Sequence, residues 1–340
     1  MTSRSARKAA LVVALESGFL IASTQVQLSQ QPGGQQPGPG AAAAGQRGGR
    51  GGAAIDPRVQ QRTYLFTDTN EQLPYAVFAS SKVSKDKKNP LIVALHGLGG
   101  DQNTMMRGNA LQLAEEGGYI LVGPMGYNSS GWYGAPATMA TGTGGAGGGG
   151  GLGGGRGAAP GAGAGRGAGP GGPGAAPGAG AGRGAGPGST TLGTPNETSQ
   201  RSEKDVMNIL DMIRKEFNVD ENRTYLMGHS MGGAGSIYIG VKYASNWAAV
   251  GAEAPATAPA GLTPDNFSLE PAKNVPMIIV QGDMDTLVPV AGTRRWIEKM
   301  KDLKMTYEYV EVPGGDHGSV LTTGAPDIFA VFAKHTKSAR

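Results

Sequence analysis

The residues best suited to chemistry surround Ser230, in the run Gly228-His229-Ser230-Met231-Gly232. This G-x-S-x-G pattern follows a strand-like apolar run and opens a helix-like one, which is the context of a nucleophile elbow. Such a turn holds its serine in a strained backbone conformation, and the two glycines leave room where side chains would collide. We therefore expect the Ser230 hydroxyl to project from the edge of a sheet as a nucleophile.

A serine hydroxyl is a weak nucleophile at neutral pH and needs an adjacent base. The chain contains four histidines, and their positions distinguish them. His96 follows a strand-like run, and His335 lies five residues from the end of the chain. His229 is next to Ser230, but its side chain is expected to point away from the serine. His317, in a glycine-lined loop after the last strand-like run, is therefore the predicted base.

The imidazole of such a pair needs a carboxylate that fixes its tautomer and stabilises the imidazolium form. After a nucleophile elbow, the acid comes before the histidine along the chain. The loop Gly282–Pro289 offers two candidates, Asp283 and Asp285. We predict that Asp285 orients His317, because the fourth residue of this G-x-x-D-x-x-V-P loop lies over the sheet edge. Asp283 is expected to cap its own loop, and Asp316 is too close to His317 to reach its far ring nitrogen.

Two backbone amides are expected to form an oxyanion hole. One belongs to Met231, directly after the nucleophile, and the other to Leu98, in the glycine-rich loop after the strand-like run Leu91–Leu95. A glycine-rich loop could instead bind phosphate, but no Gly-Lys-Ser/Thr follows and the G-x-G-x-x-G spacing is missing. No cluster of Cys, His and Asp has metal-ligand spacing, so we expect no metal and no other cofactor.

Alternating strand-like and helix-like runs position these residues. Near the start, Thr63–Phe66 and Leu73–Phe78 predict an antiparallel pair of strands. Strands that then alternate with helices predict βαβ crossovers and an α/β fold with a doubly wound, mostly parallel sheet. The later strands are expected at Leu91–Leu95, Tyr119–Val122, Thr224–Met227, Ala248–Ala252, Pro276–Gln281 and Tyr307–Val312, and the helices at Thr104–Glu116, Met231–Tyr243, Thr293–Leu303 and Asp327–Lys334. One more helix is expected after Ser202 and Asp205, which form an S-x-x-D capping pair.

Glycine separates the chain into folded and low-complexity parts. Residues 31–54 and 136–190 hold 35 of the 60 glycines and offer almost no apolar surface, so we predict that both are disordered. The cost of closing a loop grows only with the logarithm of its length, so a surface loop can accept the second stretch as an insertion. The remaining residues suffice for one core. We expect a linker over residues 25–54 and one catalytic domain over residues 55–340, interrupted at 136–190.

The first 24 residues resemble an export signal. Arg4, Arg7 and Lys8 precede the apolar run Ala9–Leu15, which predicts a signal peptide and a secreted or periplasmic protein. The chain has no cysteine, which excludes disulfides and thiol catalysis but is compatible with either side of a membrane. No run reaches 18 uninterrupted apolar residues, so no membrane span is expected.

The positive net charge does not indicate nucleic acid binding. The formal net charge is +4, but five arginines lie in the two glycine-rich stretches, which contain no acidic residue; +4 minus five leaves −1 for the rest of the chain. Binding of phosphates needs Lys and Arg clustered on a folded surface. Nucleic acid is therefore not expected as a partner.

Six segments carry a resemblance to a known family: Leu95–Gly100, Gly123–Gly134, Glu203–Val206, Val219–Gly233, Gln281–Pro289 and Gly314–Gly318. In these segments the chain resembles the polyhydroxybutyrate depolymerase and feruloyl esterase branch of the α/β-hydrolases. The resemblance implies an α/β-hydrolase fold and a serine esterase with Ser230, Asp285 and His317 as its triad. The substrate would then be a small-molecule or polymeric ester.

The sequence leaves the substrate and the oligomeric state open. Gln281 stands where many family members have a histidine, and His229 stands where other residues are common. Trp132 and Tyr133 either stack on an aromatic acid or pack against the insertion, and His229 is a further candidate substrate contact beside Ser230. Two other functions remain possible: a serine peptidase of the prolyl-oligopeptidase type, and a non-catalytic surface-binding protein with a hydrolase fold.

Overall fold

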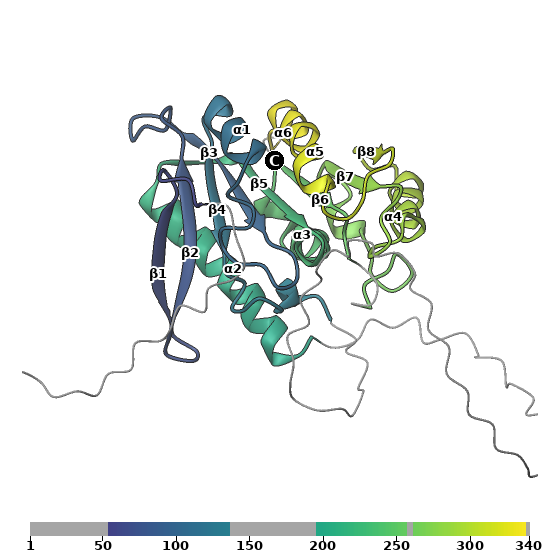
Figure 1. The fold of residues 1–340 in the computed structure, drawn as a ribbon, viewed down its shortest axis with the longest axis horizontal. Helices are drawn as coiled ribbons and strands as arrows, with labels where there is room; N and C mark the ends of the chain where they lie inside the picture. Colours follow the sequence, from purple (N-terminus) through teal and green to yellow (C-terminus); the bar gives the residue numbers. More distant parts are fainter. Residues whose placement is uncertain (1–53, 137–194, 257–260, 338–340) are drawn as a thin grey trace, which may run out of the picture. The chain divides into compact units, whose positions relative to one another are not determined.

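Eight strands form one sheet in the computed structural model, which describes residues 54–136, 195–256 and 261–337 (Figure 1). The strand order is β1-β2-β4-β3-β5-β6-β7-β8; β2 is antiparallel to both β1 and β4, and the remaining pairs are parallel. The strands are β1 Gln60–Phe66, β2 Glu71–Ala79, β3 Asn89–Leu95, β4 Ile120–Pro124, β5 Val219–His229, β6 Ala249–Glu253, β7 Met277–Gly282 and β8 Tyr307–Val312. The predicted doubly wound, mostly parallel sheet is therefore confirmed. The predicted signal peptide, and nearly all of the predicted linker and insertion, lie outside the described residues.

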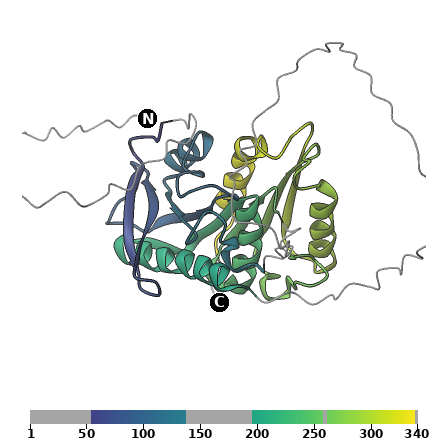
Figure 2. The ribbon, with the colours of Figure 1, turned by 60° about the horizontal axis from the view of Figure 1, so that its bottom comes forward.

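Helices cover both faces of this sheet (Figures 1 and 2). Apolar side chains of α1 and α6 pack against one face, and those of α2, α3 and α4 pack against the other. The helices are α1 Asn109–Gly117, α2 Glu197–Glu216, α3 Met231–Lys242, α4 Val290–Asp302, α5 Val320–Thr323 and α6 Ala325–Lys334, with short 3-10 turns at Trp132–Gly134, Ala244–Asn246 and Glu270–Ala272. Within the described ranges, no helix is long and apolar enough to cross a bilayer.

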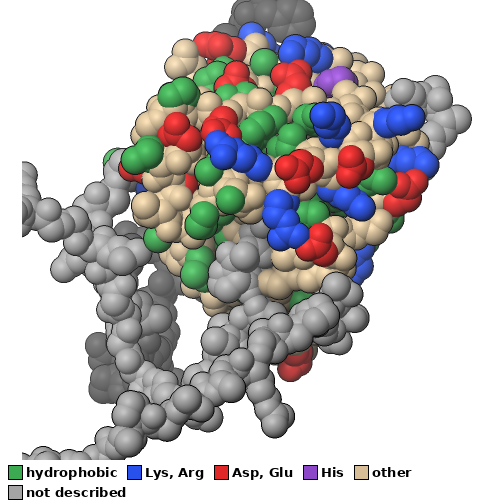
Figure 3. All heavy atoms as spheres, turned by 90° about the vertical axis from the view of Figure 1, so that its right-hand side faces the viewer, with side chains coloured by type: hydrophobic (Ala, Val, Ile, Leu, Met, Phe, Trp, Pro, Cys, Tyr) green, Lys and Arg blue, Asp and Glu red, His purple; other side chains and the backbone are tan. Residues whose placement is uncertain are grey.

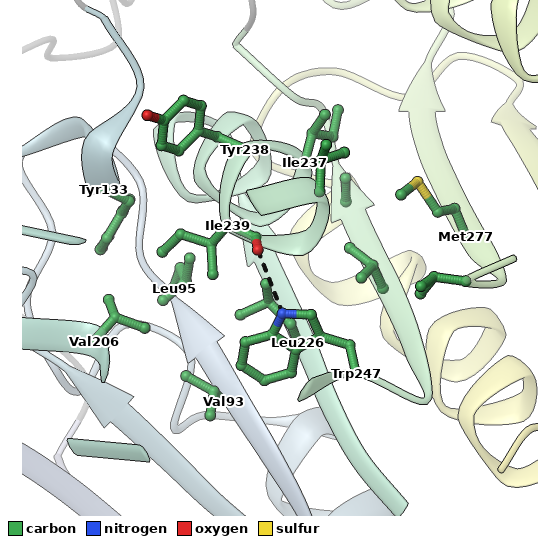
Figure 4. Packing of buried hydrophobic residues seen from close by; sticks show 14 of the residues in the cluster. Val93, Leu95, Tyr133, Val206, Leu226, Ile237, Tyr238, Ile239, Trp247 and Met277 are labelled. Carbon is green, nitrogen blue, oxygen red and sulfur yellow. Dashed lines mark hydrogen bonds between the residues drawn. The ribbon is translucent and has the colours of Figure 1, made fainter. Parts of the chain in front are cut away.

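The central strand β3 is buried along its whole length, because it lies between β4 and β5 and helices cover both of its faces. Side chains of a strand alternate between the two faces, so Val93 and Leu95 enter the core beneath α2 and α3. Figure 4 shows them near Leu226 and Trp247, whose Nε1 donates a hydrogen bond to the carbonyl of Ile239. In the register between β3 and β5, Leu95 lies opposite Gly228. The loop after β3 therefore emerges beside the predicted nucleophile turn.

Helix α1 begins five residues later than its apolar spacing predicts. Residues 101–108 form turns, in which the Asp101 carboxylate accepts from the amide of Asn103 (2.9 Å) and the Thr104 hydroxyl accepts from the amide of Asp101 (3.0 Å). Gly108 then has a φ of 53°, outside the helical region. The side chains of Asp101 and Thr104 thus hold a turn in place of the first helical turn.

The predicted capping pair at the start of α2 is wrong. The helix begins at Glu197, and the side chain of Asn196 caps it by accepting from the amide of Ser199 (2.8 Å). Ser202 and Asp205 lie inside the helix and are buried. Their side-chain oxygens accept from the amides of Tyr133 and Tyr127 instead of from amides of the helix. Residue type and spacing alone do not distinguish these distant partners from a local cap.

The loop between β4 and the 3-10 turn at Trp132–Gly134 depends on these two side chains. Tyr127, Trp132 and Tyr133 all have positive φ angles, of 63°, 57° and 51°. Such conformations cost about 1–3 kcal/mol each in residues other than glycine. The Ser202 hydroxyl accepts from the amide of Tyr133 (3.1 Å), and the Asp205 carboxylate accepts from the amide of Tyr127 (3.0 Å). Helix α2 therefore supplies the acceptors that hold this strained loop.

We expect Ser202→Ala to destabilise the protein, because it leaves the buried amide of Tyr133 without its partner. The loss should be about 1–3 kcal/mol, which lowers the melting temperature by roughly 2–10 °C. Differential scanning calorimetry measures it, with the exposed Ser245→Ala as the matched control. Equal melting temperatures for the two variants would contradict this account of the loop.

Candidate active site

Ser230 lies at the junction of β5 and α3 in a strained conformation, with φ 58° and ψ −116°. Neighbouring backbone holds it on both sides. Its amide donates to the carbonyl of Glu253 (2.8 Å), and its carbonyl accepts from the amide of Ala256 (2.9 Å). The segment after β6 therefore fixes the position of the turn that carries the hydroxyl.

The two glycines of the elbow allow the elements around Ser230 to approach closely. A Cβ atom at Gly232 would collide with the carbonyl oxygen of Leu95, at the end of β3. A Cβ atom at Gly228 would collide with the carbonyl oxygen of Gly232 itself. Strand β3, the turn and the first residues of α3 can pack at this distance only without those side chains.

The structure brings the three predicted side chains into one hydrogen-bonded chain. The hydroxyl of Ser230 lies 2.8 Å from Nε2 of His317, and Nδ1 of His317 lies 2.8 Å from Oδ2 of Asp285. The side chain of Asp285 is fully buried, whereas that of His317 is 18% exposed. Since a carboxylate only accepts, Nδ1 carries the proton of the neutral imidazole and Nε2 is free to accept from the serine.

Asp285 is fixed by donors from its own loop and from β7. Its Oδ1 accepts from the amides of Leu287 (2.9 Å) and Val288 (2.8 Å), and its Oδ2 accepts from Nε2 of Gln281 (3.0 Å). Gln281 is fully buried and in turn accepts from the hydroxyl of Thr293 (2.8 Å). The sequence showed Gln281 only as a departure from the family pattern, and its place behind the acid was not predicted.

The sequence predicts that Asp283 caps its own loop, and this prediction is wrong. Its carboxylate accepts from the amide of Gly314 (2.6 Å), in the loop that carries His317. The amide of Met284 also donates to the carbonyl of Gly315 (3.0 Å). The loops that carry the acid and the histidine are therefore joined directly. The bond from Asp283 spans 31 residues of sequence, which is why local turn chemistry did not reveal it.

His229 contacts the backbone of His317. Its Nε2 donates to the carbonyl of His317 (2.8 Å), and the two rings lie 4.9 Å apart. Burial lowers the pKa of His229 to about 4, so the ring is neutral at neutral pH with its proton on Nε2. His229 is a predicted substrate contact, but only 8% of the residue is exposed. The hydrogen bond that it forms in this structure is to the loop of His317.

The two predicted oxyanion donors belong to the loop after β3 and to the start of α3. Met231 is the first residue of α3, and Leu98 follows Gly97, where a Cβ atom would lie 3.2 Å from Cβ of Ser230. Neither the Leu98 amide nor the Met231 amide donates a hydrogen bond to any of the residues that the structure describes. Both are therefore available to an anion beside Ser230.

Tyr133 is one of two aromatic residues predicted to contact either a substrate or the insertion. Tyr133 is fully buried, its hydroxyl donates to the carbonyl of His96 (3.1 Å), and its ring packs edge-on against the His96 ring at 5.7 Å. Trp132 is half-buried and packs against the core. In this structure the Tyr133 ring is part of the core, and nearly all of the insertion, its other predicted partner, lies outside the described residues.

Glu253, at the end of β6, was not predicted from the sequence. It is fully buried, and neither carboxyl oxygen has a hydrogen-bond partner among the described residues. Burial raises the pKa of this carboxyl well above its usual range, so we expect it to be protonated at neutral pH. A single glutamate inside the apolar run from Ala248 to Ala254 was the available signal.

Charges on the outer face near α4 are mixed. Arg294 pairs with Glu311, and Arg295 pairs with Asp265. Figure 3 shows acidic and basic side chains interspersed across this face.

No group of three or more His, Cys, Asp or Glu residues that could hold a metal occurs within residues 54–136, 195–256 and 261–337.

Comparison with known proteins gives one family match. Residues 191–323 match the model of the phospholipase/carboxylesterase family. A search of curated proteins finds no significant match.

Solved structures share the fold over most of the chain. A thermostable esterase is 18% identical, with a TM-score of 0.54, over 83% of this chain and 64% of that one. A CE1 ferulic acid esterase from Anaeromyces mucronatus is 20% identical (TM-score 0.51; 81% and 90% covered). An S-formylglutathione hydrolase from Agrobacterium tumefaciens is 16% identical (TM-score 0.56; 84% and 98% covered). This chain thus spans less than two thirds of the thermostable esterase.

We expect Glu253→Gln to change how stability depends on pH. The pKa of Glu253 is raised in the folded state above the unfolded value of about 4.3. Its contribution to stability is therefore greatest below about pH 4 and is lost as the pH rises, by up to about 1.4 kcal/mol per pH unit. The glutamine variant should consequently gain stability relative to the wild type between pH 4.5 and 8.

Urea unfolding across this pH range measures the difference. The exposed Glu298→Gln is the matched control and should follow the wild type. Parallel curves for wild type and Glu253→Gln would mean that Glu253 is ionised in the folded protein.

Proposed function

We propose that this chain is a serine esterase, since it has an α/β-hydrolase fold and its residues 191–323 match the phospholipase/carboxylesterase family model. One observation carries the proposal: Ser230, His317 and Asp285 form a hydrogen-bonded chain, with both links at 2.8 Å. This order of hydroxyl, imidazole and carboxylate is the one that activates a serine nucleophile.

In the acylation step, the Ser230 oxygen attacks the ester carbonyl and Nε2 of His317 takes the hydroxyl proton. Asp285 stabilises the resulting imidazolium through its bond to Nδ1. The negative charge moves to the former carbonyl oxygen, where the amides of Leu98 and Met231 stabilise it. The tetrahedral intermediate then collapses, the bond to the alcohol oxygen breaks, and His317 returns its proton to the leaving alcohol.

Deacylation repeats these steps with water as the nucleophile. His317 takes a proton from the water as it attacks the acyl carbonyl, and the same two amides stabilise the second oxyanion. The bond between the acyl carbon and the Ser230 oxygen breaks, and His317 returns the proton to the serine. The free acid is released and the resting enzyme is restored.

Exposed apolar side chains near the site support an ester with apolar groups. Leu98, Met284 and Leu287 are 60–64% exposed, and all three lie on the loops that carry the oxyanion amide and Asp285. We propose phenolic, short-chain or polyester substrates for this reason. A panel of p-nitrophenyl esters, methyl ferulate, polyhydroxybutyrate and peptide p-nitroanilides tests the proposal. Faster turnover of the anilides than of the esters would favour a peptidase instead.

We expect Ser230→Ala and His317→Ala each to lower kcat/KM for p-nitrophenyl acetate by about 10⁴-fold or more, because each removes part of the nucleophilic machinery. Steady-state kinetics measures the loss, and circular dichroism checks the fold. Ser245→Ala and His335→Ala are the matched controls. More than a few per cent of wild-type activity in a folded Ser230→Ala variant would refute the assignment of the nucleophile.

Asp285→Asn should lower kcat by roughly 10³–10⁴-fold, because an amide cannot hold the required tautomer of His317 or stabilise its imidazolium. Asp283→Asn keeps an oxygen that can accept from the amide of Gly314, so its kcat should stay within about 10-fold of wild type. The comparison uses one substitution at two positions of one loop. The opposite ranking of the two variants would assign the acid to Asp283.

A further inference from the structure

His96, at the end of β3, has both ring nitrogens beside carbonyl oxygens. Nδ1 lies 2.7 Å from the oxygen of Gly97, and Nε2 lies 2.8 Å from the oxygen of Met125. The side chain is buried, with 1% of the residue exposed. A carbonyl oxygen only accepts hydrogen bonds, and a neutral imidazole has only one N–H to donate. Both contacts are hydrogen bonds only if both ring nitrogens carry protons.

We propose that His96 is a buried imidazolium that polarises the peptide between Gly97 and Leu98, and so strengthens the Leu98 amide as a donor to the oxyanion. In this role His96 is a positioning residue, since it acts on the reaction through the Leu98 amide. The inference rests on the proposed esterase function, because that function assigns the amide to the oxyanion.

The geometry of the peptide links the two groups. The carbonyl of Gly97 and the N–H of Leu98 belong to one planar trans peptide unit, so they point in opposite directions. A charged donor on the carbonyl oxygen forms a strong hydrogen bond and withdraws electron density from the peptide. The N–H at the other end then becomes a better donor, as in a cooperative hydrogen-bond chain. The amide of Gly100 adds a second donor to the same oxygen (3.0 Å).

The polarised peptide lies at the nucleophile. A Cβ atom at Gly97 would lie 3.2 Å from Cβ of Ser230, so the two backbones are in close contact there. The Leu98 amide has no acceptor among the described residues. Its hydrogen-bonding capacity is therefore open to the oxygen that becomes negative when Ser230 attacks.

The groups around His96 can accommodate a positive charge. Burial raises the pKa of Asp205, from α2, while a hydrogen bond from Tyr64 (2.5 Å) and the attraction of a charged His96 act in the opposite direction. The ring of Tyr133, from the 3-10 turn at Trp132–Gly134, meets the His96 ring in a T-shaped arrangement and adds no charge. On the side of β5, His229 is neutral, so it does not repel the imidazolium. Two carbonyl oxygens and one nearby carboxylate thus offset part of the cost of burying the cation.

His229 provides an internal comparison. It is also buried, but its ring contacts a single carbonyl oxygen, that of His317. One acceptor needs only one N–H, and burial lowers the pKa of His229 to about 4. The two buried histidines on either side of Ser230 are therefore expected to be in opposite protonation states at neutral pH.

Nitrogen NMR of the full chain labelled with ring-¹⁵N histidine tests the protonation state directly at pH 7.5. The four histidines are assigned with His229→Gln, His317→Gln and His335→Gln, so that His96 itself stays unaltered. We expect both His96 nitrogens to be protonated and to resonate as an imidazolium, and His229 to have one unprotonated nitrogen. An unprotonated nitrogen on His96 would overturn the proposal. The NMR measurement does not require esterase activity. It can therefore refute the charge on His96 even if the proposed esterase function is correct.

Kinetics tests the effect on the oxyanion. Removing one oxyanion donor lowers kcat by about 10²–10³-fold. The His96→Gln substitution only weakens the Leu98 amide as a donor, so we expect it to lower kcat by about 10-fold or more. KM should change by less than about 3-fold, and the affinity for a boronic acid, which forms a tetrahedral adduct on Ser230, should fall by the same factor as kcat/KM. His335→Gln is the matched control. A raised KM with unchanged kcat, or unchanged boronic acid affinity, would contradict polarisation of the Leu98 amide. If His96→Gln does not fold, the NMR measurement on the wild type decides.

Discussion

The backbone of Ser230 is the constraint on which the rest of the site depends. A φ of 58° is unfavourable for serine, and it persists because the residue is held at both ends, through the carbonyl of Glu253 and the amide of Ala256. The absence of a side chain at Gly232 lets β3 approach the turn. The position of the hydroxyl is therefore set by three elements, β3, β6 and α3, and the flanking loops only have to reach it.

Hydrogen bonds between those loops supply the remaining order. Asp283 joins the loop of the acid to Gly314, in the loop of the histidine, and His229 binds the carbonyl of His317 from the strand of the nucleophile. Gln281 fixes Asp285 from the buried end of β7. The segments that carry Ser230, Asp285 and His317 are thereby joined to one another by hydrogen bonds of their backbones or side chains. A shift of one loop would have to break several hydrogen bonds at once, so the geometry is stiff where reactivity needs it.

The sequence predicted most of the strands and the three side chains that the structure joins by hydrogen bonds, because both depend on local or chemically restrictive signals. An apolar run such as Leu91–Leu95 indicates a buried strand without reference to the rest of the chain, and the elbow motif restricts which serine can act. The wrong capping pair has a physical cause. Ser202 suits a local cap by residue type, but its hydroxyl accepts from the backbone amide of Tyr133, 69 residues away in sequence.

Several ionisable groups are buried around Ser230, and they differ in the number of hydrogen-bond partners that each one has. Asp285 accepts from four donors, counting His317, and these hydrogen bonds offset part of the cost of burying its oxygens. Glu253 has no donor in the described part of the chain, and burial favours its neutral form. The same principle separates the histidines, since His229 faces one acceptor and His96 faces two. The hydrogen-bond partners of these groups thus favour a carboxylate behind His317 and, in the proposal above, a cation behind the Leu98 amide.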